Sequence, residues 1–290
     1  MESKTNTFSN YLSLVKFSHT IFALPFAIIG YFLAITYTEA KFDIKLFALV
    51  VLCMVFARSA AMAFNRYIDR NIDEQNARTA IREIPAGIVK PKSALIFVIS
   101  NCILFIGTTY FINPLCFYLS PVALLVVLGY SLTKRFTALC HLILGLGLSL
   151  APIGAYLAVT GKFDWLPLFF SFAVLFWVSG FDIIYALQDE EFDRSKNLKS
   201  IPVLLGKKGA LMLSNILHLI SVGFIVYAGI YAEFTLWYWG GAIIYALLLF
   251  YQHTLVKPND LSKINLAFFT TNGIASVVFA VFVLIDLFIK

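Results

Sequence analysis

Two short stretches of the sequence place oxygen-bearing side chains at helical intervals. In the first, NRYIDRNID, Asn65, Asp69 and Asp73 follow one another four residues apart. Each such step turns a side chain by only about 40° around an α-helix and advances it by about 6 Å, so the three form one stripe. The second stretch, DIIYALQDEEFD, repeats this pattern at steps of three, four and four residues, in Asp182, Tyr185, Asp189 and Asp193.

Carboxylate and amide oxygens grouped in this way suit a hard divalent cation. Each stripe comes where a long apolar run ends, and the dipole of a helix disfavours anions at its C-terminus. Carboxylates gathered there need a compensating cation, and a plain solvated helix end would not explain the repeated spacing. Mg²⁺ takes oxygen ligands and usually bridges one or two carboxylates to the phosphates of a substrate. The stripes therefore predict a site for magnesium and a phosphorylated ligand.

Basic side chains near the two stripes fit the phosphate half of such a site. Arg58 lies seven residues before Asn65, two turns back on the same helical face and inside an apolar run. An arginine within a membrane span is costly and is a functional candidate by default. Other basic residues lie close to the stripes, and each could hold a phosphate or be ordinary surface charge. They are Arg78, Arg82, Lys134, Arg135 and Lys199.

The elements that must position these residues are membrane helices. The chain has 290 residues, of which 60% are hydrophobic and only 13% charged, whereas about a quarter of the residues of a soluble domain are charged. A soluble protein is excluded, and the first apolar run is too long for a cleaved signal peptide. Nine runs are predicted to be transmembrane helices. They lie near 17–37, 46–67, 93–111, 114–132, 138–158, 166–187, 209–232, 234–255 and 264–289.

The distribution of charge over the connections supports nine spans. With this number, the N-terminus and the connections after the second, fourth, sixth and eighth helices share one face. Of the 22 Lys and Arg residues, only four fall on the other face, namely Lys41, Lys45, Lys162 and Lys290. Because cytoplasmic loops carry an excess of basic residues, the first face is expected to be cytoplasmic.

Two connections on this basic face are long, and each follows one of the stripes. They cover residues 68–92 and 188–208. Long connections on a rigid scaffold often carry function, so we expect the chemistry there, within a single transmembrane domain over residues 1–290. The small-residue stretch LGLGLSLAPIG at 144–154 lies away from the charged face. We expect it to serve close helix packing and not phosphate binding.

These features resemble the motifs of the UbiA superfamily of intramembrane prenyltransferases. The first family signature is N-x-x-x-D-x-x-x-D, here NRYIDRNID, and the second is D-x-x-x-D after a tyrosine and an earlier aspartate, here DIIYALQDEEFD. A third element, a tyrosine four residues before a lysine, stands here as YSLTK with Tyr130 and Lys134. The resemblance covers essentially the whole chain. It implies an all-α integral membrane protein with nine transmembrane helices bundled around a central cavity.

The resemblance also implies an activity, namely Mg²⁺-dependent transfer of a polyprenyl group from a polyprenyl diphosphate to an aromatic acceptor in membrane quinone biosynthesis. Two Mg²⁺ ions are expected to lie with the diphosphate between the motifs. The implied metal ligands are Asn65, Asp69, Asp73, Asp189 and Asp193. Asp182 is either a further ligand or a residue that orients the acceptor.

Further roles follow from the same resemblance. Tyr130 and Tyr185 would lie near the allylic carbon, where their ring faces can stabilise an allylic cation. The partners implied are the prenyl diphosphate, a small aromatic acceptor and the lipid bilayer of a bacterial-type inner membrane; neither nucleic acid nor an obligate protein partner is expected. The basic residues expected to bind the diphosphate are Arg58, Arg78, Arg82, Lys134 and Lys199.

The start of the first helix departs from relatives that act on 4-hydroxybenzoate. The stretch KFSHTIFALPFA has Lys16 and His19 where those relatives tend to carry an arginine and a lysine. Both residues are candidates for substrate contacts, with an interfacial role as the alternative for His19. The acceptor is therefore a benzoate of the 4-hydroxybenzoate type or, alternatively, a naphthoate in menaquinone biosynthesis.

A membrane transporter or ion carrier is the alternative from a different class, because carboxylates in membrane spans also mark ion pathways. Sites for transported ions lie near the middle of the membrane on interrupted helices. The carboxylates of this chain gather at helix ends beside long basic loops. Their expected depth in the membrane therefore favours an enzyme.

Overall fold

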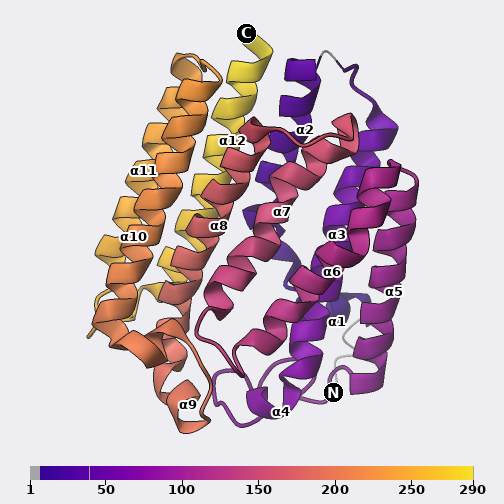
Figure 1. Ribbon diagram of the computed structural model, residues 1–290. Coiled ribbons are helices and arrows are strands. Elements are labelled where there is room, and N and C mark those ends of the chain that lie inside the picture. Colours follow the sequence, from indigo (N-terminus) through magenta and orange to yellow (C-terminus); the bar gives the residue numbers. More distant parts are fainter. Residues whose placement is uncertain (1–6, 39, 290) are drawn as a thin grey trace.

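A computed structural model of the chain describes residues 7–38 and 40–289, without the side chains at positions 7, 8 and 17–19. Over this part the protein is a bundle of long helices without strands (Figure 1). The long helices are α2 (Leu24–Thr38), α3 (Ile44–Ile68), α5 (Pro91–Tyr110), α6 (Pro114–Thr133), α7 (Cys140–Thr160), α8 (Trp165–Ala186), α10 (Ile201–Tyr231), α11 (Leu236–Leu255) and α12 (Asn272–Ile289).

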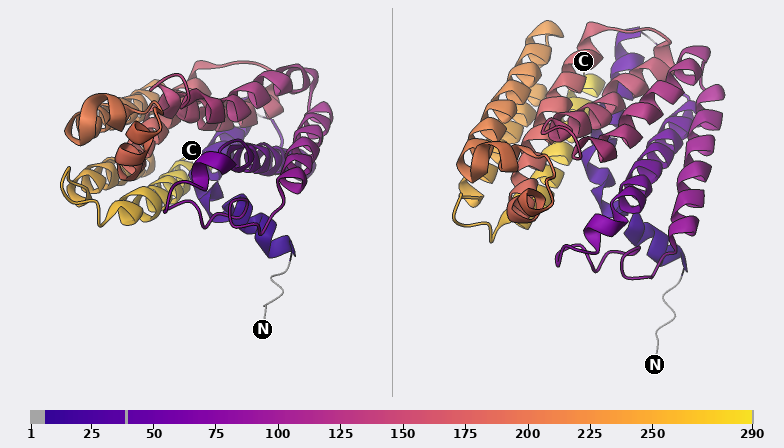
Figure 2. Two further views of the ribbon diagram at one scale, coloured as in Figure 1. Left: turned by 90° about the horizontal axis from the view of Figure 1, so that it is seen from below. Right: turned by 60° about the horizontal axis from the view of Figure 1, so that its bottom comes forward.

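Short helices gather at one end of this bundle, which is the lower end in Figure 1. Among them, α4 and α9 carry the ends of the two acidic stripes (Figure 2). A π-helical stretch, η3 (Leu266–Thr271), leads into α12. The short helices are α1 (Thr7–Leu14), η1 (Phe17–Phe22), α4 (Arg70–Asp73), η2 (Leu187–Asp189) and α9 (Glu190–Ser195).

The protein is an integral membrane protein. Eight helical segments within the described residues are long and apolar enough to cross a membrane. The span predicted at 234–255 corresponds to α11, a helix of 20 residues. This helix is not one of the eight, because its Trp, Tyr, Gln and His residues lower its mean hydropathy. However, α1 and the end of α12 lie at opposite ends of the bundle (Figure 1). This arrangement requires an odd number of crossings, so α11 is the ninth.

Local sequence signals start several of these helices. The side chain of Asp43 accepts hydrogen bonds from the backbone N–H groups at the start of α3, and Asp164 does the same for α8. Asn113 caps α6, in which Pro114 occupies the first position. These caps satisfy donors that have no partner within a helix, so each span begins at a defined residue at the membrane surface.

If η1 is counted with α2 and η3 with α12, the predicted boundaries hold within a few residues except at α10. This helix was expected from residue 209 and begins at Ile201, where the hydroxyl of Ser200 accepts a hydrogen bond from the N–H of Val203. Gly206 interrupts it with a φ of 66°, a left-handed conformation that glycine adopts without strain. The second long connection is therefore shorter than predicted, and η2 and α9 occupy most of it.

A large aromatic core holds α2, α8, α10, α11 and α12 together. Phe26, Phe170, Trp177, Tyr238 and Phe279 are fully buried in it. The indole N–H of Trp177 donates to the side-chain oxygen of Asn272 over 2.8 Å. Rings that are packed and hydrogen-bonded in this way fix the helices on one side of the bundle. One of these helices, α8, contains the first part of the second acidic stripe, so the core also fixes the position of that stripe.

Asp286 ties α12 to the start of α11, and its loss should destabilise the protein. Its fully buried carboxylate accepts from the N–H of Thr235 at 2.9 Å, from the hydroxyl of Thr235 at 2.6 Å and from the N–H of Tyr238 at 3.0 Å. Asp286→Ala leaves these donors without an acceptor, and we expect it to lower the free energy of unfolding by about 3 kcal/mol. Thermal unfolding in detergent measures this, with Asp260→Ala on an exposed loop as the control. Equal melting temperatures for the two variants would contradict the prediction.

Candidate functional site

A polar cavity of about 580 Å³ lies at the end of the bundle that carries α4 and α9. Both acidic stripes contribute to its wall, and basic side chains alternate with them. The basic residues outnumber the acidic ones by seven to five, so an anion is favoured there. The charged residues of the wall are Lys16, Arg58, Arg66, Arg78, Arg82, Lys134, Arg135, Asp69, Asp73, Asp182, Asp189 and Asp193.

The first stripe forms one wall of the cavity, where α3 ends and α4 begins. The amide of Asn65 donates to Asp69 over 3.2 Å, and a guanidinium nitrogen of Arg135 lies 2.9 Å from the same carboxylate. Asp73 is buried, and one nitrogen of Arg82 contacts its two oxygens at 2.7 and 2.8 Å. Two carboxylates of this wall are thus each neutralised by an arginine.

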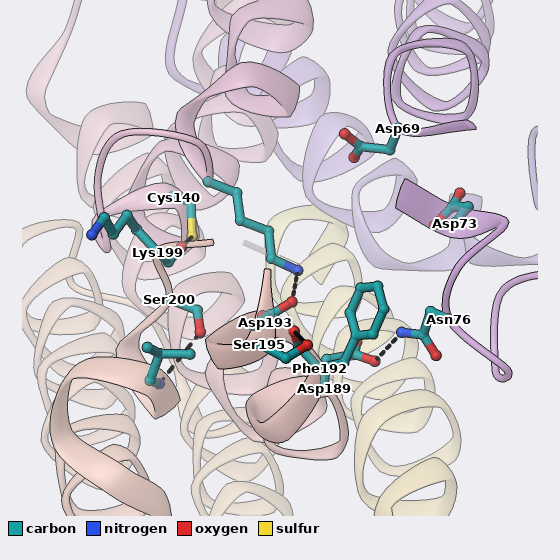
Figure 3. A network of polar contacts seen from close by, with 12 residues as sticks. Asp69, Asp73, Asn76, Cys140, Asp189, Phe192, Asp193, Ser195, Lys199 and Ser200 are labelled. Atoms are coloured by element: carbon teal, nitrogen blue, oxygen red, sulfur yellow. Dashed lines mark hydrogen bonds and ion pairs between the residues drawn. The ribbon is translucent and has the colours of Figure 1, made fainter. Parts of the chain in front are cut away.

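The second stripe forms the opposite wall, in η2 and α9 (Figure 3). Asp189 is held by two guanidinium nitrogens of Arg78, with the Nε atom at 3.0 Å, and by the amide of Asn76 at 3.2 Å. Asp193 forms an ion pair of 2.7 Å with Lys134. Since Arg78 and Asn76 belong to the connection after α4, their contacts with Asp189 join the two walls.

The charges of the site shift the pKa values of its members in different directions. Burial raises the pKa of the Asp69 carboxyl, and the hydrogen bond and charge of Arg135 offset only part of this effect. Burial also lowers the pKa of Arg78, but the hydrogen bonds and charge of Asp189 outweigh it and raise the pKa above its ordinary value. Arg78 therefore stays cationic at every physiological pH, and Asp69 depends on nearby cations to stay ionised.

Asp193 is the most deeply buried carboxylate of the site. Its side chain is fully buried, and one of its oxygens lies 2.7 Å from the ammonium group of Lys134. A buried carboxylate is unfavourable unless a cation compensates it, and Lys134 supplies one such charge. No group of three or more acidic, Cys or His side chains within the described residues is arranged to hold a metal. The oxygen donors around the cavity are of the kind that suits an ion which takes one or two carboxylates and completes its shell with ligand oxygens and water.

Two arginines of the cavity have positive charges without ion-pair partners in the part of the chain that the structure describes. Arg66 is buried, Arg58 is partly buried, and the Nε atom of each is buried without a hydrogen-bond partner. Arg58 donates to the backbone oxygen of Lys16 over 3.2 Å. Guanidinium groups held in this way beside a cavity are suited to bind an anionic ligand.

Asp182 differs from the other four aspartates of the cavity, because its partner is a histidine. One of its oxygens lies 2.6 Å from Nδ1 of His141, and the backbone N–H of Ile201 donates to Nε2 of the same ring over 3.3 Å. These two contacts fix the orientation of the imidazole ring. The carboxylate of Asp182 is therefore oriented by a histidine and not by an arginine or a lysine.

Aromatic rings close the cavity on the apolar side. The hydroxyl of Tyr185 accepts from Arg78 over 3.2 Å, and its ring lies 4.1 Å from that of Phe268 between centroids. Tyr130 lines both this cavity and a neighbouring apolar one. Both tyrosines are thus next to the charged groups, where their rings can face a cationic carbon.

The neighbouring apolar cavity has a volume of about 380 Å³ and lies among α3, α5, α6 and α7. It extends from Arg58 and Tyr130 to Leu157 and Phe163 near the other end of the bundle. The two cavities meet at the residues that line both, which are Arg58, Met62, Tyr130, Leu144 and Leu148. A ligand with a charged head and a long apolar tail can therefore occupy both.

The structure brings most of the predicted site residues together. All the acidic and tyrosine candidates line the polar cavity, as do Asn65, Lys16, Arg58, Arg78, Arg82 and Lys134. Lys199 is a correction: its side chain is exposed and outside this lining, and Figure 3 shows it directed away from Asp193. The reason is local, since its backbone N–H is bound to the oxygen of Lys134. The side chain of His19 lies outside the described residues.

Sequence reasoning missed several residues of the cavity. Neither His141 nor Asn76 has a helical spacing to the stripes that would single it out. Arg66 lies within the first motif, but its charge alone does not distinguish it from the other basic residues of this face. Arg135 was a candidate for phosphate binding, and the structure pairs it with Asp69.

Comparisons with known proteins identify relatives of the chain. A family model described as the UbiA prenyltransferase family matches residues 23–274. A 4-hydroxybenzoate octaprenyltransferase from Nitrosomonas europaea is 30% identical over 249 residues, which are 85% of this chain and 84% of the relative. Another protein of that name, from Aeromonas salmonicida, is 30% identical over 242 residues, 82% of each chain.

Solved structures share the fold. The apo structure of a UbiA homologue from Aeropyrum pernix K1 has a TM-score of 0.83 and 30% identity, over 92% of this chain and 98% of that one. The structure of a UbiA homologue from Archaeoglobus fulgidus bound to DMAPP and Mg²⁺ has a TM-score of 0.76 and 22% identity, over 97% of this chain and 100% of that one.

Proposed function

The chain belongs to the UbiA prenyltransferase family and is a prenyltransferase, and we propose that it transfers a polyprenyl group from a polyprenyl diphosphate to an aromatic acceptor of the 4-hydroxybenzoate type. The observation that carries this proposal is the pair of arginines, Arg58 and Arg66, which have no ion-pair partner among the described residues and line a cavity that continues into an apolar one. Charged and apolar subsites in this order match a diphosphate with an isoprenoid tail.

The proposed metal ligands are the carboxylates of the two walls, Asp69 and Asp73 on one and Asp189 and Asp193 on the other, with the amide oxygen of Asn65. Bound Mg²⁺ would neutralise the charge that develops on the diphosphate as the allylic C–O bond breaks. The position of all five side chains around one polar cavity supports this assignment. The A. fulgidus homologue bound to DMAPP and Mg²⁺ supports the choice of ion.

The chain's own residues would then guide each part of the reaction. Arg58 and Arg66 hold the diphosphate as it leaves, and their charge stabilises it more in the transition state than in the ground state. The faces of Tyr130 and Tyr185 stabilise the allylic cation, which a dry cavity protects from water. A ring carbon of the acceptor forms the new C–C bond with this cation, and the ring then loses a proton.

Asp182 is proposed to act on the acceptor and not on the metal. Its carboxylate is held by His141, whereas each of the other four aspartates is paired with an arginine or a lysine. A carboxylate oriented in this way can accept a hydrogen bond from an acceptor hydroxyl and so increase the electron density of the ring. The apolar cavity would hold the isoprenoid tail.

The basic end of the bundle is proposed to face the cytoplasm of a bacterial-type inner membrane. The basic loops lie at this end, whereas Lys41, Lys45 and Lys162 lie at the other, which fits the positive-inside rule. The chain would act as one domain. Because the short helices α4 and α9, which carry Asp73 and Asp193, lie at the end of the bundle and not at its middle (Figure 1), the transporter alternative has no support.

An assay by product mass tests the proposal. The purified protein is incubated with Mg²⁺, an isotopically labelled prenyl diphosphate, and either 4-hydroxybenzoate or a hydroxynaphthoate. We expect the benzoate to gain the mass of the labelled prenyl group less one proton, with release of diphosphate. The naphthoate arm tests the alternative acceptor. Release of diphosphate without a prenylated product from either ring would contradict the proposed acceptor class.

A further inference from the structure

The apolar cavity is lined on one side by the smallest residues of α7. Positions 147, 151, 154 and 158 are Gly, Ala, Gly and Ala, at steps of four, three and four residues, and all four line this cavity. Such steps keep the residues on one face of the helix. These four small residues therefore leave room along this face, between the larger side chains of α7 that also line the cavity, such as Leu148 and Leu157.

The glycines of this stretch have different surroundings. A Cβ atom at Gly145 would lie 2.4 Å from the backbone oxygen of Leu175, so this glycine allows close packing of α7 on α8. A Cβ atom at Gly154 would meet nothing within 4 Å, and one at Gly147 only Val127 at 3.7 Å. The packing role expected for the whole stretch thus holds for Gly145, whereas Gly147 and Gly154 border open space.

We propose that Gly147 and Gly154 determine the length of isoprenoid tail that the protein accepts. This inference rests on the proposed function, in which the tail enters the apolar cavity from the polar one. Since α7 starts beside the polar cavity at Cys140 and His141 and runs away from it, the two glycines lie at increasing depth. Gly147 is about 9 Å and Gly154 about 20 Å beyond His141 along the helix, at the usual rise per residue.

A larger side chain at either position would occupy the channel at that depth. Gly147→Leu would stop the tail near the diphosphate, and Gly154→Leu would stop it about 10 Å further on. A tail that ends before the obstruction is unaffected, whereas a longer one must displace packed atoms. Each variant should therefore have its own limit of tail length, and the limit should be shorter for Gly147→Leu.

The test is transfer from an equimolar mixture of dimethylallyl, geranyl, farnesyl and geranylgeranyl diphosphates, with products resolved by mass. We expect Gly154→Leu to reduce geranylgeranyl relative to dimethylallyl transfer by about tenfold or more, because overpacking of an apolar site has an effect of this size. Gly147→Leu should reduce farnesyl transfer as well. Dimethylallyl transfer by the same samples shows that the variants are folded.

Gly223→Leu is the matched control, since Gly223 lies in α10, lines neither cavity and has nothing within 4 Å of its Cβ position. It should leave the product distribution unchanged. Unchanged distributions in both α7 variants would overturn the inference, as would an equal loss for all tails or the reverse order of limits. Failure of the proposed function is distinguishable, because the unsubstituted chain would then form no prenylated product from any tail.

Discussion

Asp189→Ala is expected to remain folded in the membrane and to lose prenyl transfer by about a thousandfold, the upper range for removal of one group that stabilises a transition state. Asp189 accepts hydrogen bonds from Arg78 and Asn76, which belong to the connection after α4. Its removal takes away a proposed metal ligand and also frees Arg78 from its position. Initial rates with a labelled prenyl diphosphate measure the loss.

The matched control is Glu191→Ala, which removes an exposed carboxylate two residues away from the same short segment. It should retain full activity, because Glu191 does not line the cavity. On the other wall, Asp69→Ala should match the loss of Asp189→Ala, with exposed Glu74 as its control site. Full activity in either aspartate variant, at normal yield of folded protein, would refute a site built from both walls.

Removal of divalent metal should stop turnover completely and reversibly. The cavity wall has only two more basic than acidic side chains, which is too little charge to stabilise a departing diphosphate on its own. Without Mg²⁺ the carboxylates of the two walls would also repel the diphosphate. We expect an excess of chelator to abolish product formation and added Mg²⁺ to restore it, as measured by the release of labelled product.

The control for this experiment is the same chelator saturated with Mg²⁺ beforehand, which should leave the rate unchanged and exclude an effect on the detergent or the membrane. Undiminished turnover in excess free chelator would count against metal ions as part of the site. The outcome is independent of the acceptor, since the metal is assigned to the departure of diphosphate.

Patterns that depend on neighbours along the chain predicted the fold and the acidic part of the site. Apolar runs gave the helices because the bilayer fixes their length. The steps of four from Asn65 to Asp73 predicted one stripe, and the structure brings these residues to one wall of the cavity. The start of α10 was missed although a signal existed, since Ser200 and Pro202 are typical of a helix N-terminus.

Contacts between distant residues could not be predicted in this way. Arg78 and Asp189 are 111 residues apart, and His141 and Asp182 are 41 apart. Which basic residue neutralises which carboxylate depends on how the connections fold over the end of the bundle, and many pairings have similar charge complementarity. Lys199 illustrates the limit. It lies on the predicted basic connection, but its side chain is directed outward, because its backbone N–H is bound to the oxygen of Lys134.

The position of the apolar cavity has a consequence for how this protein can diversify. The cavity lies among α3, α5, α6 and α7, whereas Asp182, Tyr185 and Phe268, which border the polar cavity, belong to α8 and η3. Free-energy effects of substitutions at sites without shared contacts are additive to a good approximation. Preference for a tail and preference for a ring can therefore evolve, or be engineered, as separate modules. Only substitutions at the shared boundary, such as Met62 or Leu148, would change both at once.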